Sequence, residues 1–245
     1  MAAGVGSRLS DAPHDPKCTL NIGEGSVISH TMDILRDKGV EPHMVIGYER
    51  NKVRAALSDY PEVIFHENPF YRATNSIGSL WIARSVITSA ITKGEDLLLA
   101  NADVYWTSDM LDLLRGVSDE CVMLCDRTRA LTGDYFFHLE DGHITEYGKK
   151  LPPERRDCEY VGISFVRASF LPTFLGHLDK LIWKEDYNMW WEDVLYDACD
   201  VHPVRGLDVD GRFWSEIDYI EDYQRILDHL GVNADAHELL LSKSF

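Results

Sequence analysis

The chain has 245 residues, 45% of them hydrophobic, and can bury a sizeable core as one α/β domain. Its formal net charge of −17 at pH 7 repels nucleic acids and anionic membranes, so a polyanionic ligand must be small and held by a local basic pocket. The sequence contains no apolar run of about 18 residues and no secretory signal pattern, and we expect a cytoplasmic protein without membrane insertion.

The chain opens with the glycine-rich segment MAAGVGSRL, and a Pro-Lys pair follows shortly afterwards. Gly4 and Gly6 permit positive φ and let backbone N–H groups approach phosphate oxygens, while Arg8 and Lys17 neutralise the phosphate charge. A Walker A loop would end in Gly-Lys-Ser/Thr, and a dinucleotide-binding loop would need a third glycine where Leu9 stands. The segment therefore predicts a different type of triphosphate loop, and a simple tight turn is the alternative.

Apolar runs then alternate with helix-period segments, which is typical of an open parallel sheet flanked by helices. We expect helices over residues 26–39, 77–92 and 219–230, and strands at 43–48, 63–66 and 96–103. From about residue 127 to 160 the pattern loosens, and an Asp-Gly pair between alternating apolar residues predicts a hairpin at 136–144. We interpret residues 127–160 as a small insertion beside the main sheet of a single domain that spans residues 1–245.

Several of these segments together resemble one enzyme superfamily. The run AAGVGSRL followed by Pro-Lys is similar to the signature of the MobA-like nucleotidyltransferases, which make sugar nucleotides and CDP-alcohols. Residues 68–80, 144–150 and 160–164 resemble segments of the phosphocholine and phosphonate cytidylyltransferase branch. The resemblance runs in patches from residue 1 to about 225, and it implies a Rossmann-like, open, mostly parallel sheet flanked by helices. That family places a strand directly before its glycine loop, so we expect a strand upstream of Met1 that this sequence lacks.

The resemblance also implies a Mg²⁺ site built from two carboxylates. Asp103 follows the buried strand at 96–103 and is similar to the family's metal aspartate, although it also suits a helix cap. The late motif FWSEID resembles the one whose aspartate closes the metal site, which implies Asp218 as the second ligand with Glu216 in support. Two surface acids before a helix are the alternative. Mg²⁺ suits the chemistry, because it screens two anions that must approach each other.

Nucleotide contacts are implied for small and polar residues in three segments. They are Ala3, Gly4, Gly6 and Ser7 in the glycine segment, Asn75 and Ser79 at a predicted helix start, and Ala102. Amides and hydroxyls at a helix start suit the edge of a pyrimidine base, and ordinary N-capping is the alternative. Arg8 and Lys17 would hold the β- and γ-phosphates of CTP.

The acceptor side is implied by the Gly-Lys and Tyr-Val-Gly-Ile-Ser segments and by the aromatic run at residues 183–193. Lys149 would contact the acceptor's phosphate, or it is simply a surface lysine beside a hairpin. The candidate pocket residues are Tyr160, Trp183, Tyr187, Trp190, Glu192 and Glu216. Their aromatic rings and carboxylates suit a cationic head such as choline, but the helical spacing of the aromatic residues also fits an ordinary core stripe.

The predicted function is transfer of CMP from CTP to a phosphoalkyl or phosphonate acceptor, of the phosphocholine or 2-aminoethylphosphonate type, with release of pyrophosphate. Two other functions are compatible with the sequence. A sugar-1-phosphate nucleotidyltransferase would share the loop and metal site, and a non-catalytic nucleotide-binding module would share the fold. The partners expected are CTP, Mg²⁺ as cofactor and a small acceptor, without nucleic acid, and a homodimer is compatible with the sequence.

Overall fold

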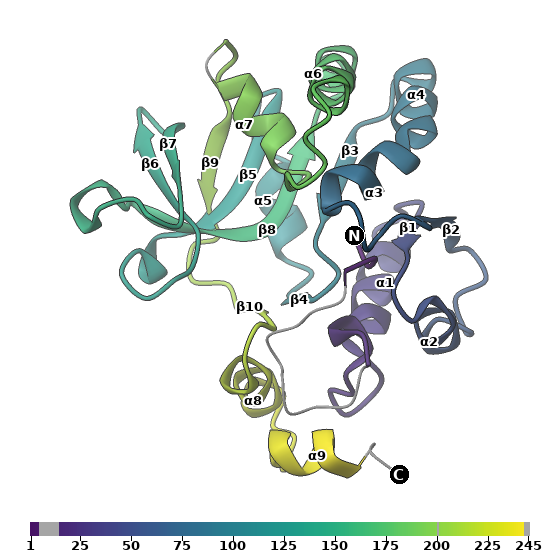
Figure 1. Cartoon of the computed structure of the whole chain (residues 1–245). Coiled ribbons are helices and arrows are strands. Elements are labelled where there is room, and N and C mark those ends of the chain that lie inside the picture. The colour runs from purple at the N-terminus through teal and green to yellow at the C-terminus, as the bar shows by residue number, and fades with distance from the viewer. Residues whose placement is uncertain (5–14, 200, 243–245) are drawn as a thin grey trace. The chain divides into compact units, whose positions relative to one another are not determined.

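The computed structural model describes residues 1–4, 15–199 and 201–242 (Figure 1). The chain forms two compact units. Unit 1 comprises Met1–Arg72, Asn101–Thr107 and Phe213–Phe245, and unit 2 comprises Ala73–Ala100 and Ser108–Arg212. The single domain with a small insertion stays a prediction.

Unit 1 contains two small sheets and the helices around them. Its strands are β1 (His43–Ile46), β2 (Ile64–Glu67), β4 (Val104–Trp106) and β10 (Trp214–Glu216), and its helices are η1 (Lys17–Thr19), α1 (Val27–Asp37), α2 (Arg50–Ala56), α8 (Ile220–His229) and α9 (Ala236–Ser242). β1 and β2 pair in parallel, and β10 pairs antiparallel with β4. The strands expected at 43–48 and 63–66 and the helix expected at 219–230 are confirmed.

Helix α1 connects the two apolar clusters of unit 1. Ser26 caps its first turn through a reciprocal capping box with Ser29, and Gly39 follows its end with a φ of 68°. Ile28 and Met32 belong to the cluster around β1, whereas Val27 belongs to the cluster that includes α8. The helix expected at residues 26–39 is therefore confirmed, and its apolar residues pack into both clusters.

The first residues of the chain lie beside β1. The backbone N–H of Ala2 donates to Val45 O (2.9 Å), and Ala2 forms a parallel bridge with Ile46. On the other side, the N–H of Ala102 donates to Met1 O (3.2 Å). Met1 and Ala2 thus lie between β1 and the segment that leads into β4.

Unit 2 is built on a strongly curved six-stranded sheet. Its strands are β3 (Leu97–Ala100), β5 (Cys121–Asp126), β6 (Phe136–Glu140), β7 (His143–Gly148), β8 (Cys158–Val166) and β9 (Arg205–Asp208). β8 pairs with β3, β5 and β6, and the order β8-β5-β9-β7-β6 closes on itself through the β6–β8 pairing. Only β5 and β9 run parallel in this sheet. The prediction of an open, mostly parallel sheet was therefore wrong. The long strand β8 pairs with β5 and also with β6 of the hairpin, and these two pairings close the sheet into a ring.

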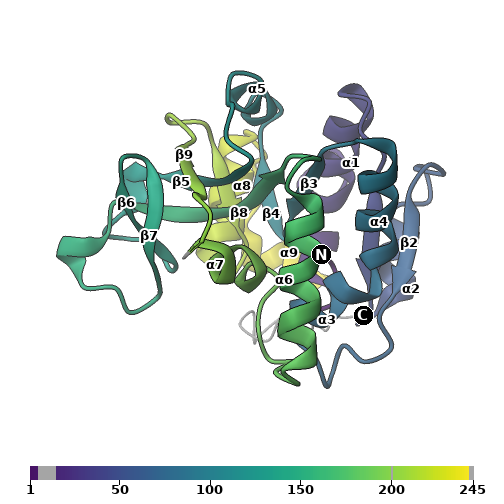
Figure 2. The same ribbon diagram turned by 90° about the horizontal axis from the view of Figure 1, so that it is seen from above.

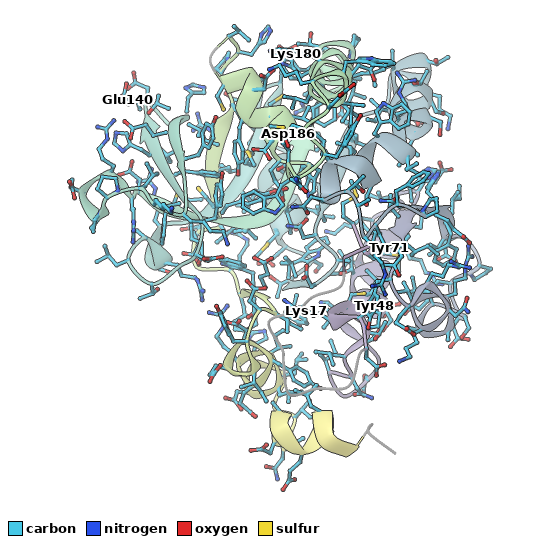
Figure 3. The ribbon with its side chains drawn as sticks, in the orientation of Figure 1. Lys17, Tyr48, Tyr71, Glu140, Lys180 and Asp186 are labelled. Carbon is cyan, nitrogen blue, oxygen red and sulfur yellow. The ribbon has the colours of Figure 1, made fainter. Side chains whose placement is uncertain are left out.

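The hairpin of unit 2 follows the sequence prediction. β6 and β7 are joined at Asp141 and Gly142, whose φ angles of 51° and 81° are those of a two-residue turn that twists with its strands. Glu140 marks this tip in Figure 3. The Asp-Gly signal thus located the turn correctly.

The helices of unit 2 pack beside its sheet. They are α3 (Ser76–Ile82), α4 (Arg84–Lys93), α5 (Met110–Leu114), α6 (Leu171–Trp183) and α7 (Asp193–Cys199), with short 3₁₀ turns η2 (Arg127–Arg129) and η3 (Pro153–Arg155). The single helix expected at 77–92 is divided at Ala83 into α3 and α4. α4 and α6 lie side by side (Figure 2). Among the described helices, none has the length and apolar character that crossing a bilayer requires.

Two histidines of unit 1 are held in surroundings that disfavour the imidazolium. Burial lowers the pKa of His66, and the neighbouring His43, whose Nδ1 lies 3.0 Å from His66 Nε2, lowers it further. Burial also lowers the pKa of His30, which lies against the Tyr105 ring and whose Nε2 is 2.9 Å from Trp106 O. In the unfolded chain both histidines titrate near 6.5.

We expect His66 to make the protein less stable in mild acid. Below the unfolded pKa of 6.5 the unfolded chain binds the proton more readily than the folded chain, so the free energy of unfolding falls as the pH decreases. The fall in the urea midpoint between about pH 7.5 and pH 5.5 should be smaller in His66→Gln, which keeps a polar side chain beside His43. An equal fall in the two proteins would contradict the assignment.

Candidate functional site

Asp103 lies in the turn that leads into β4, at the place where the sequence predicts a ligand site. Its backbone carbonyl accepts a hydrogen bond from the N–H of Ile217 (3.0 Å), which continues the pairing of β4 with β10. This bond fixes the segment around Asp218 next to Asp103, although the two residues are far apart in the sequence. The second carboxylate is therefore supplied by the chain that returns to unit 1 at Phe213.

Lys17 joins this pair of carboxylates from the short helix η1. Its Nζ lies 2.7 Å from Asp218 Oδ1, and the two side chains are only 7% and 16% exposed. The backbone N–H of Asp218 donates to the Asp222 carboxylate (3.1 Å), which also receives the N–H of Tyr219 at the start of α8. Asp222 thus holds the backbone at Asp218, and the Asp218 carboxylate faces a buried cation.

The electrostatics of this group favour an additional positive charge. Burial raises the pKa of Asp103 and the charge of Asp218 raises it further, while Lys17 acts in the opposite direction. Burial, with Asp103 adding to it, also raises the pKa of the Cys18 thiol to about 12, so this cysteine is an unreactive neighbour. Among the described residues, Lys17 and, less strongly, the amino terminus are the cations that lower the pKa of Asp103.

The donor set fits a hard divalent cation that also binds a ligand. Mg²⁺ prefers oxygen donors and takes one or two carboxylates together with substrate phosphates and water. Asp103 and Asp218 supply two carboxylates, and no group of three or more His, Cys, Asp or Glu side chains in the described residues is arranged to hold an ion. The pair alone does not make a closed protein site, and triphosphate oxygens would complete the coordination. Glu216 ends β10 opposite Val104, two residues before Asp218.

The glycine segment begins next to this group. The carbonyl of Ala3 accepts from the N–H of Tyr48 (3.2 Å), and Gly4 has open space where a Cβ would stand. Tyr48 and Tyr71 lie near each other, with ring centroids 6.2 Å apart, as Figure 3 shows together with Lys17. Ala102, which adjoins Asp103, is buried against Met1. The predicted residues Gly6, Ser7 and Arg8 lie outside the described residues.

Asn75 and Ser79, predicted to contact the base, lie on α3 in unit 2. The Asn75 side chain caps α3 by accepting from the N–H of Ser76 (2.8 Å), and its amide donates to Asn188 O (3.1 Å). The Asn75 N–H also donates to Tyr187 O (2.7 Å). N-capping, the alternative considered for Asn75, is therefore confirmed. Ser79 is buried, and base contact stays a prediction for both residues.

The aromatic run at 183–193 does not form one helix, so its aromatic side chains do not lie on one helical face. α6 ends at Trp183, Glu185 takes a positive φ of 60°, and α7 begins at Asp193. Trp183 is 78% exposed, Trp191 is fully buried, and Tyr187 and Trp190 are 40% exposed. A single cage of these rings is therefore not formed. Glu192 is buried, and so is Tyr160, whose hydroxyl lies 3.0 Å from Ser164 Oγ.

Trp190 instead contributes to a cavity of about 530 Å³ in unit 2. The cavity is lined by Tyr135, Tyr147, Gly148, Lys149, Lys150, Leu151 and Trp190. Behind it, the buried ring of Tyr196 stacks on Tyr135 and on Tyr147, with centroids 5.6 Å and 4.2 Å apart. The structure thus brings Lys149 and Trp190 together, as the acceptor-side prediction requires, and leaves Trp183 and Tyr160 out.

Sequence reasoning missed Tyr135, Tyr147 and Tyr196. Tyr135 directly precedes β6, and Tyr147 lies in β7, where it pairs with Phe137 across the strands. Their proximity in the hairpin was the only available signal, because each is a single tyrosine in an otherwise ordinary strand or loop. Tyr196 lies on α7, far along the chain from the other two tyrosines, and contacts them only in the folded protein.

Comparisons with known proteins show which enzymes the chain is similar to. No family model matches the chain. Over 91% of its length the chain is 25% identical to the CTP:phosphoglutamine cytidylyltransferase of Campylobacter jejuni, 96% of which is covered. It is 20% identical over 92% of its length to the choline-phosphate cytidylyltransferase of Streptococcus pneumoniae, 94% of which is covered. The resemblance to the cytidylyltransferase branch of the nucleotidyltransferases is confirmed.

The fold agrees with this nucleotidyltransferase resemblance. The structure is similar to that of the inositol-1-phosphate CTP transferase from T. maritima, with a TM-score of 0.75 and 17% identity, and the match covers 95% of each chain. The α/β class predicted from the sequence is therefore confirmed, although the sheet of unit 2 is mixed and closed.

We expect Lys17→Met to destabilise the protein by about 3 kcal/mol, because it leaves two neighbouring carboxylates without their buried cation. Lys52→Met is the matched control, since Lys52 also forms a short ion pair with an aspartate, Asp15, at 2.6 Å, but its side chain is 47% exposed. The control should cost about 1 kcal/mol or less. Urea unfolding at pH 7 measures both, and equal effects would show that the Lys17–Asp218 pair is no more important than a surface pair.

Proposed function

We propose that this chain is a Mg²⁺-dependent cytidylyltransferase, which transfers CMP from CTP to the phosphate or phosphonate of a small acceptor and releases pyrophosphate. The observation that carries the proposal is the group of buried Lys17 and half-buried Asp103 and Asp218 in unit 1. Two carboxylates with an incomplete counter-charge beside a glycine segment suit the binding of a triphosphate with a metal ion. The names of the relatives support CTP as the donor.

The chemistry requires position and charge rather than a covalent intermediate. An oxyanion of the acceptor attacks the α-phosphorus of CTP, the bond from that phosphorus to the bridging oxygen breaks, and pyrophosphate leaves in line. Lys17 would neutralise the departing phosphates, with Arg8 as its predicted partner, and backbone N–H groups of the glycine segment would bind phosphate oxygens. When bound, Mg²⁺ supplies charge screening, and Asp103 and Asp218 are the residues that would hold it.

The acceptor would be a small phosphorylated or phosphonate alcohol, and phosphocholine and 2-aminoethylphosphonate are the first compounds to test. Lys149 in unit 2 is the residue proposed to contact the acceptor. The position of Lys149 in the wall of a cavity supports this role better than the alternative of an ordinary surface lysine. Relatives named for phosphoglutamine and for choline phosphate support a phosphorylated acceptor without fixing its head group.

Pyrophosphate release with Mg²⁺ tests the function. CTP, UTP and ATP are each combined with phosphocholine, 2-aminoethylphosphonate, further phosphorylated alcohols and glucose 1-phosphate. We expect release with CTP and a phosphoalkyl or phosphonate acceptor. Release only with glucose 1-phosphate and UTP would favour a sugar nucleotidyltransferase, and CTP binding without release in any mixture would favour a binding module.

Asp103→Asn should lower the rate of release by about a thousandfold, since it removes one of the two carboxylates proposed to hold the metal ion. Asp37→Asn is the control, because Asp37 is an exposed aspartate at the end of α1 in the same unit. Its activity should be unchanged. Full activity of Asp103→Asn would refute the metal assignment, and circular dichroism of both variants would show whether the fold is intact.

A further inference from the structure

The cavity of unit 2 combines aromatic walls with lysines. Tyr135, Tyr147 and Trp190 form the walls, and Lys149 and Lys150 are its charged lining residues. No aspartate or glutamate belongs to the described lining. A cationic head such as choline is normally bound by aromatic faces and carboxylates that attract its charge. Both charged residues of this lining are lysines, and one of them, Lys149, is paired with the Asp134 carboxylate.

The Trp190 ring, which is the aromatic face best suited to bind a cation, already lies against the Lys149 ammonium. Lys149 Nζ lies 5.6 Å from the centroid of the Trp190 ring, which is within the range of a cation–π interaction. The same ammonium donates a hydrogen bond to the Asp134 carboxylate. An ammonium group has three N–H donors and can hold Asp134 and a ligand anion together. A quaternary ammonium would have to compete with Lys149 for the Trp190 face and would be repelled by its charge.

The segment that carries Asp134 and Tyr135 is held by a hydrogen bond to the buried Glu159. The buried Glu159 carboxylate on β8 accepts from the N–H of Asp134 (2.7 Å) and from the Arg129 side chain. Gly133 lies against the same carboxylate so closely that a Cβ would overlap it. The backbone of Asp134 is therefore held by a buried acid, while the Asp134 and Lys149 side chains form an ion pair that is 55% and 34% exposed. A held backbone on one side of this pair lowers the ordering that ligand binding requires.

We propose that this cavity selects an acceptor whose head carries a carboxylate, bound by Lys149, and disfavours acceptors whose head carries only a cation. The proposal rests on the proposed function, since the acceptor is the second substrate of that reaction. It departs from the choline-type head expected from the aromatic run at 183–193. Trp190 then acts as a platform for Lys149, and Tyr135 and Tyr147 pack against the aliphatic part of the head.

A matched pair of acceptors tests the head group alone. O-phosphoserine differs from O-phosphoethanolamine only by its carboxylate, and phosphocholine adds a quaternary ammonium. We expect kcat/KM with CTP to be about tenfold or more higher for O-phosphoserine than for O-phosphoethanolamine, as one charge-assisted hydrogen bond allows. Equal values, or a preference for phosphocholine, would overturn the proposal.

Variants of Lys149 assign the preference to this residue. Lys149→Met should abolish the advantage of O-phosphoserine and improve the relative rate with phosphocholine, because it exposes the Trp190 face. Lys149→Arg keeps the charge and should retain the advantage. Lys93→Met is the control, since Lys93 lies at the end of α4 and pairs only loosely with Glu95, at 3.6 Å. A ratio of the two acceptors that is the same in wild type and Lys149→Met would overturn the role of Lys149.

Calorimetry separates this proposal from the proposed function. Binding of O-phosphoserine and of phosphocholine to the full chain is measured without turnover. Tighter binding of O-phosphoserine that is lost in Lys149→Met, with no pyrophosphate release from CTP, would reject the cytidylyltransferase and keep the cavity's preference. Turnover of CTP with phosphocholine, combined with binding of phosphocholine alone, would keep the enzyme and reject the preference. Absence of binding of either compound would also reject it.

Discussion

The partial neutralisation of two half-buried carboxylates by a buried lysine is the constraint on which the candidate site depends. Asp103 and Asp218 come from segments more than a hundred residues apart, and the hydrogen bond from Ile217 to the Asp103 carbonyl brings them together. Lys17 stabilises the pair at 2.7 Å from Asp218. Because burial strengthens repulsion between like charges, the remaining negative charge favours a cation, and a metal-bound triphosphate meets that need.

A protein with a net charge of −17 repels anions through its overall field. Affinity for the proposed triphosphate would therefore have to come from short-range contacts in a site with little water. In unit 1 the proposed contacts are a buried lysine, carboxylates that suit Mg²⁺, and the backbone of the glycine segment. In unit 2 the positive charge of Lys149 is held in place by Asp134 and by the ring of Trp190. In each unit a lysine, Lys17 or Lys149, is thus placed beside the proposed ligand site.

The local sequence signals predicted most individual elements. The helical pattern of residues 26–39, which ends at a glycine, located α1, and the Asp-Gly pair located the β6–β7 turn. These succeeded because capping and positive φ depend on neighbouring residues only. The closed sheet was not predicted, because the ring depends on β8 pairing with both β5 and β6 across the fold. Apolar runs show that strands are buried, but they do not show which strands pair or in which direction.

The sequence by itself indicated the resemblance to cytidylyltransferases and suggested Lys17, Asp103 and Asp218 as candidate site residues, since these residues stand in short recognisable motifs. Only the tertiary structure decided which aromatic rings meet. The spacing of Trp183, Tyr187 and Trp190 suggested one face of a helix, but the chain leaves the helix after Trp183. Trp190 instead joins Tyr135, Tyr147 and Lys149, which lie on other elements. The reason is physical: a motif records neighbours along the chain, whereas a cavity is formed by packing between elements whose contacts no local pattern encodes.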